Sequence, residues 1–461
     1  MTSSMDQSIH TEGMRPSMIL QRTQKQPVKK LQHNQQVAEA KRTLDSLKFD
    51  SNFFHNNPPK GLPTFQQQEL DLGQVIGNGE FGVVMEIKGF NIPSDEFVPA
   101  MPGLARETTS NYYVQDLDSS EFPTTMNNEE SRNFMQEHAL REGDPRFAIK
   151  KARHEGLSRS RRETAAIDLA IEAKFLACLN HSNIIKLRAT ASKPGHDKFM
   201  IVLDRLYLIL DKKMSMWREE KKIMTGPFGV RRSKKVEHFK CKTERLLALY
   251  DIARALKHMH SLKLIYRDLK PENIGCDVRG DWKIFDFGLA RELKRDELKE
   301  APDGYDCTGL TGSRRWMAPE VVLCKLYGTK SDVYSFSLLC WHLITLDVPY
   351  GGYDVKKHMA AVVVGGERPK VRRLKSLSDP LRDAIVNGWD TNTHTRPSME
   401  DLCCTIQQEL VNRKQNVKKN SRRSTVAGIL RRSQVMRDRS SLELGRLDEI
   451  DSHDENENEE D

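Results

Sequence analysis

Three glycines, spaced as GNGEFG over residues 77–82, lie between two stretches of strand-forming residues. The segment ELDLGQVIGNGEFGVVMEIKG therefore predicts a β-hairpin with a glycine-rich turn. Glycines that bind a dinucleotide lie between a strand and a helix, so this hairpin argues against a dinucleotide-binding fold. A glycine turn between two strands is typical of a flap over nucleotide phosphates, although tight hairpins also use glycine for backbone reasons alone.

The hydrophobic pattern divides the rest of the chain into a small mixed part and a larger helical part. Residues 161–179 have apolar positions at helical spacing, and residues 198–206 form a short apolar run typical of a strand. Beyond Glu244, further segments have helical periodicity and are separated by Pro, Gly and Asp. These patterns predict an α+β fold of two lobes, with a small antiparallel β lobe containing one main helix and a larger, mainly helical lobe.

Composition limits the classes of protein to which the chain can belong. Charged residues make up 30% of the chain, and no window approaches the ~20 apolar residues of a membrane-spanning helix, so no membrane partner is expected. The start of the chain lacks a basic flank before an apolar run, which argues against a secretory signal. The cysteines lack metal-type spacing, so we expect neither disulfides nor zinc, and a location in the cytoplasm or, alternatively, the nucleus.

Both ends of the chain are polar and charged. Residues 1–65 are rich in Gln, Ser, Asn and basic residues, and residues 413–461 pass from a basic to an acidic composition. Such segments bury too little apolar surface to offset the entropy lost on ordering, so we expect two disordered tails around a domain of residues 66–412. A short helix over residues 36–47 remains open.

Motifs that follow the glycine turn carry the chemistry. The segment FAIK places Lys150 on the third predicted strand, and YRDLKPEN (266–273), DFG (286–288) and APE (318–320) follow in that order. The ordered set resembles the eukaryotic protein kinase family over about residues 70–410. The resemblance implies the bilobal kinase fold and a transferase that moves the γ-phosphate of ATP to protein hydroxyl groups.

The resemblance also implies catalytic roles for individual residues. Lys150 would hold the α and β phosphates of ATP, fixed by an ion pair to Glu172 on the following helix, with Glu163 as the competing candidate. Asp268 would orient the substrate hydroxyl and accept its proton. Lys270, two residues further on, would steady the γ phosphate. Each catalytic residue that the family requires is therefore present.

ATP and Mg²⁺ are the cofactors that the resemblance implies. Asn273 and Asp286 would bind the metal, whose charge offsets that of the triphosphate. Gly275 occupies the position beneath adenine where the family normally has Leu or Met, so we expect an open floor there unless another side chain fills it. The nucleotide would be enclosed by Gly77, Gly79, Phe81, Gly82, Val84, Ala148, Lys150, Asp204 and Leu206.

Four residues would have structural roles by the same resemblance. Arg396 would form an ion pair with Glu320, Asp332 would brace the catalytic loop from within its helix, and the ring of Tyr266 would stack in an internal column of side chains. The segments RWMAPEV, DVYSF and RPS resemble the tyrosine-kinase-like branch of the Ser/Thr kinases.

Substrate class can be inferred from the same motifs. Lys270 within RDLKPEN, and Ser313 before APE, favour Ser/Thr over Tyr, while a dual-specificity kinase and a catalytically impaired scaffold remain alternatives. The expected partners are protein substrates and an upstream kinase acting on the activation loop, residues 288–318. Thr308 is the preferred acceptor there and Thr311 the second choice. Binding to nucleic acid is not expected, since the basic tracts lack interleaved aromatic residues.

Two insertions lengthen the chain relative to the family. Residues 91–145 are acidic, stand where the family often has only a short turn, and are predicted to be mostly disordered. Residues 212–243 are basic and are expected to form a solvated surface. Neither insertion interrupts a motif.

Overall fold

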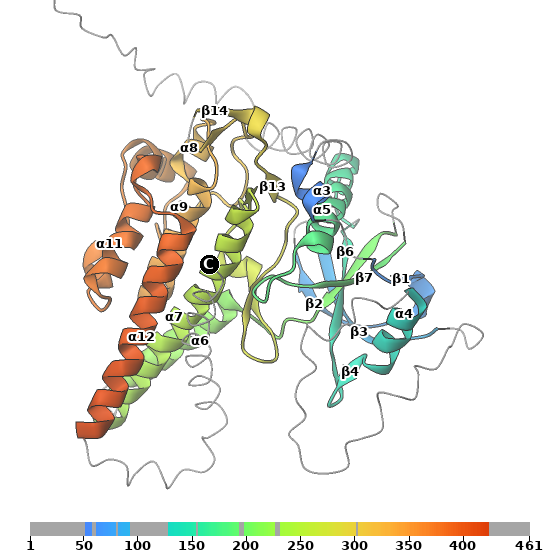
Figure 1. Cartoon of the computed structure of the whole chain (residues 1–461), viewed down its shortest axis with the longest axis horizontal. Helices are drawn as coiled ribbons and strands as arrows, with labels where there is room; N and C mark the ends of the chain where they lie inside the picture. The colour runs from blue at the N-terminus through green and yellow to red at the C-terminus, as the bar shows by residue number, and fades with distance from the viewer. Residues whose placement is uncertain are drawn as a thin grey trace, which may run out of the picture.

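The computed structural model describes residues 51–57, 61–79, 82–92, 128–153, 155–192, 198–225, 231–300 and 303–423. A β-rich lobe and a larger helical lobe stand side by side, which confirms the expected bilobal α+β fold (Figure 1). Among the described residues, no helix combines the length and the apolar character needed to cross a bilayer.

The small lobe is a six-stranded sheet covered by one long helix, α5 (Arg159–Cys178), whose first turn is capped by the side chain of Ser158. Neighbouring strands are antiparallel except at one edge, where β1 and β7 run parallel. The strands in spatial order are β1 (Thr64–Phe65), β7 (Leu187–Ala191), β8 (Met200–Asp204), β6 (Phe147–Ala152), β3 (Gly82–Phe90) and β2 (Leu70–Asn78).

The large lobe is built around α9 (Lys330–Thr345), which is buried on every side from Ser331 to Thr345. A helix without an exposed face must lie at the centre of a lobe, and the other helices surround it. The remaining helices are α6 (Leu210–Thr225), α7 (Arg231–Ser261), α8 (Pro319–Val322), α10 (Val355–Lys357), a π-helix (His358–Val364), α11 (Asp379–Gly388) and α12 (Met399–Arg423).

The remaining elements of both lobes and of the loops between them are short. Single-turn 3-10 helices lie at Gln67–Glu69, Pro271–Asn273, Arg295–Glu297, Val371–Leu374 and Thr393–Thr395. The short strands are β4 (Leu140–Arg141), β5 (Asp144–Pro145), β9 (Leu208–Ile209), β10 (Leu264–Ile265), β11 (Ile274–Cys276), β12 (Trp282–Ile284), β13 (Arg291–Glu292), β14 (Leu298–Glu300) and β15 (Gly304–Tyr305).

The predicted domain start at residue 66 is wrong, because ordered elements precede it. Helix α3 (Asn52–Asn56) lies beside α5, and β1 adds to the sheet next to β7 (Figure 1). Phe53 and Phe65 are almost fully buried. Two aromatic side chains are thus enough to anchor a short polar segment, although its average composition resembles that of a disordered tail. The helix expected over residues 36–47 lies outside the described residues.

The acidic insertion, predicted to be mostly disordered, contains ordered structure in its last part. Helix α4 (Asn128–Glu137) packs on the sheet through Met135, which has no exposed surface. Nη2 of Arg132 lies 2.7 Å from Oε1 of Glu69, and its guanidinium sits over the ring of Phe65. One apolar anchor and one basic residue within an acidic stretch therefore fix α4 to the small lobe. The preceding residues 93–127 lie outside the described residues.

The basic insertion is helical and is only partly a solvated surface. Helix α6 runs to Thr225, and α7 begins at Arg231, because Lys, Arg and Glu are good helix formers. Nε of Arg218 donates to the carbonyl of Leu346 (2.9 Å), and Nζ of Lys221 donates to that of Thr345 (3.0 Å). These cations satisfy carbonyl groups at the C-terminal end of α9, where the helix dipole is negative.

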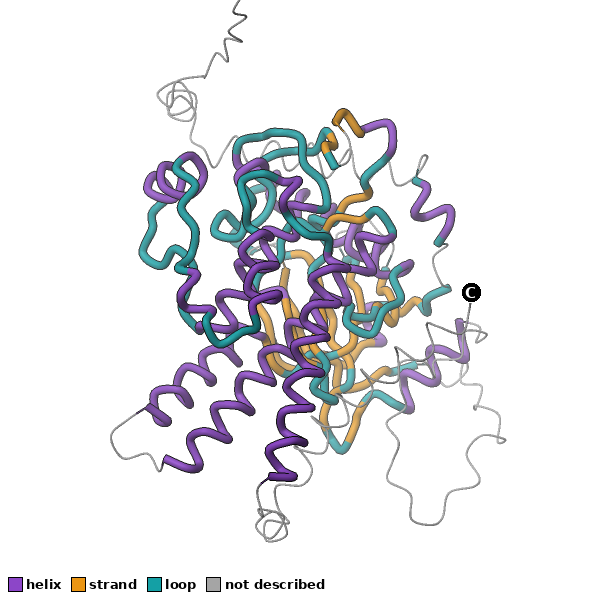
Figure 2. The backbone as a smooth tube through the Cα atoms, turned by 60° about the vertical axis from the view of Figure 1, so that its left-hand side comes forward, coloured by secondary structure: helices purple, strands orange, loops and turns teal. Residues whose placement is uncertain are grey.

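The predicted boundary at residue 413 falls inside a helix. Helix α12 continues to Arg423 and lies alongside α7, and Figure 2 shows α6, α7 and α12 extending together from the body of the lobe. Lys414 is buried, and Nε of Arg413 contacts Oε1 of Glu409 at 2.8 Å, one turn back. The basic residues after 412 thus extend a packed helix up to Arg423.

Candidate functional site

Three charged side chains from separate elements meet between the lobes. Nζ of Lys150, on β6, lies 2.6 Å from Oε2 of Glu172 on α5 and 3.0 Å from Oδ1 of Asp286. Glu172 is almost completely buried, whereas about half of the Asp286 side chain is exposed. Glu172 therefore forms the ion pair for which Glu163 was the competing candidate, and the lysine links both lobes.

Within this cluster, Lys150 and Asp286 each favour the charged form of the other. Burial alone would lower the pKa of Lys150, but Asp286 and Glu172 raise it above its ordinary value. Burial would raise the pKa of Asp286, but the charge and hydrogen bond of Lys150, together with Lys270, hold it below its ordinary value. Asp286 is therefore an anion facing the cleft, beside a lysine that stays protonated.

Asp332 of α9 fixes the backbone at the start of the catalytic loop, residues 266–273. Its carboxylate accepts hydrogen bonds from the backbone N–H groups of Tyr266 (2.8 Å) and Arg267 (2.9 Å), and Nε2 of His260 lies 3.0 Å from Oδ2. Arg267 has a φ of 72°, a left-handed conformation that is costly for a residue with a side chain. A buried carboxylate that accepts both N–H groups stabilises this turn.

Asp268 is the centre of a second polar cluster. Nζ of Lys270 donates to its Oδ2 at 2.7 Å, Nδ2 of Asn273 donates to the same oxygen at 2.8 Å, and the backbone N–H of Ser313 donates to Oδ1 at 2.9 Å. Nζ of Lys270 also donates to Oγ of Ser313 at 2.8 Å. The aspartate is thus oriented by three donors, one of which comes from the loop before residues 318–320.

Asp286 and Asn273 fit a hard divalent cation. Nδ2 of Asn273 is occupied by hydrogen bonds to the backbone and side chain of Asp268, which leaves the amide oxygen as the atom for a cation. Carboxylate and amide oxygens are the ligands that Mg²⁺ prefers, and it commonly binds through one or two such groups plus substrate phosphates. Within the described residues, no cluster of three or more His, Cys, Asp or Glu side chains could hold a metal.

The glycine turn closes over the lysine. The backbone N–H of Gly79 donates to the carbonyl of Gly82 at 2.8 Å, and a Cβ on Gly82 would lie 3.3 Å from Cε of Lys150. Gly77 is paired with Val84 across the hairpin. Small residues are therefore needed where the turn approaches the lysine. Phe81, expected at the tip of the turn, lies outside the described residues.

The other residues expected to enclose a nucleotide lie on β6, at the end of β8 and in residues 205–207, the linker between the lobes. Ala148 on β6 is buried and pairs with Leu203 on β8, and Asp204 follows at the end of that strand. The Asp204 carboxylate accepts two hydrogen bonds from Arg188, at 2.6 and 3.0 Å. Burial would raise the pKa of Asp204, but Arg188 holds it below its ordinary value. The carboxylate is thus paired with Arg188, and the backbone of Asp204 is the part expected to contact a ligand.

The expectation of an open floor at Gly275 is wrong. A Cβ placed on Gly275 would lie 2.6 Å from Cδ1 and 3.1 Å from Cβ of Leu206. Leu206 therefore fills the space from the linker, in addition to the backbone contact expected of it. The alternative in which another side chain fills the floor is the correct one.

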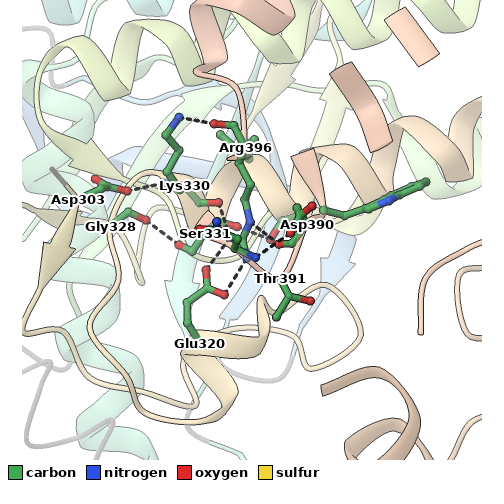
Figure 3. A network of polar contacts seen from close by, with 12 residues as sticks. Asp303, Glu320, Gly328, Lys330, Ser331, Asp390, Thr391 and Arg396 are labelled. Carbon is green, nitrogen blue, oxygen red and sulfur yellow. Dashed lines mark hydrogen bonds and ion pairs between the residues drawn. The ribbon is translucent and has the colours of Figure 1, made fainter. Parts of the chain in front are cut away.

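Buried contacts also connect the loop after residue 286 to the large lobe (Figure 3). The guanidinium of Arg396, which has no exposed surface, donates to both carboxylate oxygens of Glu320 at 2.6 and 2.9 Å. Asp303 accepts from the backbone N–H groups of Thr329 (3.0 Å) and Lys330 (2.8 Å) at the start of α9. The expected pairing of Glu320 with Arg396 is present, and Asp303 is an additional anchor.

Sequence reasoning missed two carboxylates near the site. Asp168 precedes Glu172 by one turn of α5 and contacts Gly288, and burial, followed by the charge of Asp286, raises its pKa to about 8. Its spacing of four residues from Glu172 is a signal that could have found it. Asp303 has no such signal, because its partners at the start of α9 are distant in sequence.

Tyr266 stacks as expected within the interior. Its ring meets that of Phe287 edge to face, with centroids 5.4 Å apart, and its hydroxyl donates to the carbonyl of Phe285 at 2.5 Å. Leu176 and Leu187 are buried in the same core. The column thus connects α5, the sheet and the catalytic loop.

Comparison with known proteins agrees with this arrangement. Residues 137–406 match the family described as the protein kinase domain. The chain is 35% identical over 159 residues to serine/threonine-protein kinase VIK of Arabidopsis thaliana, covering 33% of this chain and 34% of that protein. Serine/threonine/tyrosine-protein kinase HT1 of the same plant is 29% identical, with 51% and 53% covered. Ribosomal protein S6 kinase alpha-2 of Homo sapiens is 36% identical, with 42% and 22% covered. The chain thus matches between about a fifth and about half of the length of these relatives.

Proposed function

Because the chain belongs to the protein kinase family, we propose that it transfers the γ-phosphate of ATP to serine and threonine hydroxyl groups of proteins. The observation that carries the proposal is that Lys270, Asn273 and Ser313 all donate hydrogen bonds to Asp268. Lys270 also acts electrostatically on Asp286, which contacts Lys150. Phosphoryl transfer needs alignment and charge neutralisation more than covalent chemistry, and these groups supply both.

Each residue has one task in the proposed reaction. Lys150, held by Glu172, donates to the α and β phosphates, and Lys270 donates to the γ phosphate as negative charge moves toward the leaving oxygen. Asp268 orients the substrate hydroxyl and accepts its proton. Mg²⁺, held by Asn273 and Asp286, would supply positive charge that offsets the triphosphate.

The preference for serine and threonine rests on the link between Lys270 and Ser313. Nζ of Lys270 bridges Oδ2 of Asp268 and Oγ of Ser313, so the loop before residues 318–320 is tied to the acceptor end of the site. This arrangement accompanies the RDLKPEN sequence that resembles Ser/Thr kinases. The relative HT1 has tyrosine in its printed name, so tyrosine is included in the test below.

Radiolabelled ATP and peptides containing Ser, Thr or Tyr as the sole acceptor test the proposal. We expect label in the Ser and Thr peptides and about a thousandfold or greater loss in Asp268→Asn. Asp379→Asn makes the same chemical change at an exposed position on α11 and should retain activity. Wild-type turnover in Asp268→Asn would refute the assignment, and equal labelling of the Tyr peptide would establish dual specificity. No label in any peptide would favour the scaffold.

We also propose that an upstream kinase regulates the enzyme at Thr308. Thr308 is partly exposed, and its backbone carbonyl accepts hydrogen bonds from Tyr327 (2.6 Å) and Thr311 (3.0 Å). Thr311 is almost fully buried, so Thr308 is the more accessible of the two expected acceptors. Phosphate on Thr308 should raise activity, and Thr308→Ala should prevent activation by a phosphorylating extract while Thr311→Ser should not.

The proposed location is the cytoplasm or the nucleus. This rests on the sequence, in which the cysteines have no metal-type spacing, and on the free thiols of residues 178, 276, 307, 324, 340, 403 and 404. Fractionation of cells that produce the tagged chain tests the location, and recovery in a secreted or membrane fraction would contradict it.

A further inference from the structure

Helix α3 bridges two parts of the kinase domain that are far apart in sequence. On one side, Phe53 and Phe54 pack against Phe175 of α5, with ring centroids 5.9 and 5.4 Å from the Phe175 ring. Phe53 is 3% exposed, and Phe175 is fully buried. Figure 1 shows α3 beside α5, and Phe175 follows Glu172 by one turn of that helix. The aromatic contact therefore packs α3 against the helix that carries Glu172, the partner of Lys150.

The other side of the bridge is polar. Oγ of Ser51 donates to Oε2 of Glu292 at 2.5 Å, and the backbone N–H of Phe53 donates to Oε1 at 2.9 Å. Glu292 lies on β13, shortly after Asp286, and is 7% exposed. Within the described part of the chain, both hydrogen bonds to the Glu292 carboxylate come from residues 51 and 53. A buried carboxylate is thus stabilised by two hydrogen-bond donors from residues 51 and 53.

We propose that residues 51–57, which we call the N-terminal strap, position α5 so that Glu172 reaches Lys150, and couple that position to the loop after Asp286. The inference rests on the proposed kinase function, because the position of α5 matters through the Lys150 pair. Ser51, Phe53 and Glu292 are positioning residues in this device, since they would act on Glu172 through the contacts of Phe53 with Phe175 and Glu292.

Release of the strap would leave two buried groups without their present partners. Phe175 would lose its aromatic cover, and Glu292 would become a buried carboxylate without its two donors. Movement of β13 toward solvent would hydrate Glu292, and a shift of α5 from its present position could cover the Phe175 ring again. Docking of the strap therefore favours the arrangement in which α5 and β13 are both in place, and release favours the alternative.

The hydroxyl of Ser51 allows the tether to be tested apart from the helix. It donates to Glu292 and accepts from the backbone N–H of Phe54 at 3.1 Å, as a helix cap. Aspartate retains the capping acceptor but places a second negative charge against Glu292. Ser51→Asp should thus open the tether while preserving the cap of α3.

The experiment compares Ser51→Asp, Asn56→Asp and the double variant Ser51→Asp with Glu292→Gln in the full chain. Asn56 is exposed at the other end of α3, so its change adds the same charge away from Glu292. In the double variant, the amide of glutamine can donate to the new aspartate while its oxygen still accepts from Phe53. Amide deuterium uptake of α5 and kcat/KM for ATP are measured for each.

We expect Ser51→Asp to raise deuterium uptake in α5 and to lower kcat/KM for ATP about five- to twentyfold, within the usual range of coupling between sites. Asn56→Asp should stay within about twofold of the wild type, and the double variant should recover most of the loss. Wild-type α5 exchange in Ser51→Asp, or a loss that Glu292→Gln does not reverse, would overturn the proposal. Absence of peptide phosphorylation by the wild type would refute the proposed function instead, and the exchange comparison would still test the strap.

Discussion

Cδ1 of Leu206 lies 2.6 Å from the point where Gly275 would carry a Cβ, so a leucine of the linker occupies the space that the glycine leaves. Gly275 is flanked by β9 and β12 within a three-stranded sheet, which fixes its backbone. The floor beneath the expected adenine is therefore built from strand β11 and a linker residue that is distant from it in sequence.

Replacing Gly275 with Leu should weaken ATP binding. The new side chain would overpack against Leu206, at a cost of about 1 to 3 kcal/mol, or roughly a five- to hundredfold rise in the Kd for ATP. Calorimetry or a fluorescent ATP analogue measures this change. The exchange variant Gly275→Leu with Leu206→Ala should recover much of the affinity, and tighter binding in Gly275→Leu alone would contradict the filled floor.

Replacing Ser313 with Ala should lower kcat for peptide phosphorylation by about tenfold, the scale of one hydrogen bond to a charged group. The change removes the hydroxyl that accepts from Lys270, while the backbone N–H of residue 313 still reaches Asp268. The KM for ATP should change little. Ser313→Thr retains the hydroxyl and is the matched control, so an equal loss in both variants would indicate packing instead.

Replacing Glu320 with Gln should destabilise the large lobe by about 3 to 5 kcal/mol, because Arg396 would remain as a buried charge. Urea unfolding of the purified chain measures the free energy. Glu400→Gln is the matched control, since its pair with Lys257 is substantially exposed and should contribute less than about 1 kcal/mol. Similar midpoints for the two variants would show that the burial of Arg396 is not decisive.

Stability should fall as the pH drops below neutrality, in part through His342. Burial, followed by the charges of Arg218 and Arg315, lowers the pKa of His342 to about 3 from 6.5. The unfolded chain therefore binds a proton that the folded chain does not, and the stability present above pH 6.5 is lost progressively as the pH falls toward 3. At pH 5 this loss is about 2 kcal/mol.

Denaturant unfolding at pH 7 and pH 5 tests this dependence with His342→Gln. The glutamine can accept from Arg218, as Nε2 of the histidine does at 2.8 Å, but it cannot be protonated. The variant should have a smaller difference in unfolding free energy between the two pH values. An unchanged difference would exclude His342 as a source of the acid sensitivity.

The positions of the catalytic groups could be predicted because their motifs are local and ordered. Lys150, Asp268 and Asp286 each lie within a short recognisable segment, and the family resemblance placed them around one cleft. Glu172 needed a choice between two glutamates, and its place eight residues before a segment that resembles the family's turn after that helix led to the residue that pairs with Lys150. Contacts within one motif are therefore accessible to sequence reasoning.

The contacts that sequence reasoning missed join segments with no shared local pattern. Averaging over a polar stretch concealed Phe53, whose burial depends on Phe175. Charge composition suggested a solvated surface for the basic insertion, yet Arg218 and Lys221 bind carbonyl groups at the end of a buried helix. In each case the partner is supplied by tertiary structure, which composition and periodicity do not encode.

The hydrogen bond between Phe53 and Glu292 joins two residues that are synthesised at different times. The two residues are 239 positions apart, so the ribosome must deliver more than two hundred residues after Phe53 before its partner exists. During that interval Phe53 and Phe54 remain without the polar half of their binding site, although α5 has already been synthesised. The final docking of residues 51–57 can therefore occur only after β13 has emerged, so a segment synthesised before α5 is secured later than α5 itself.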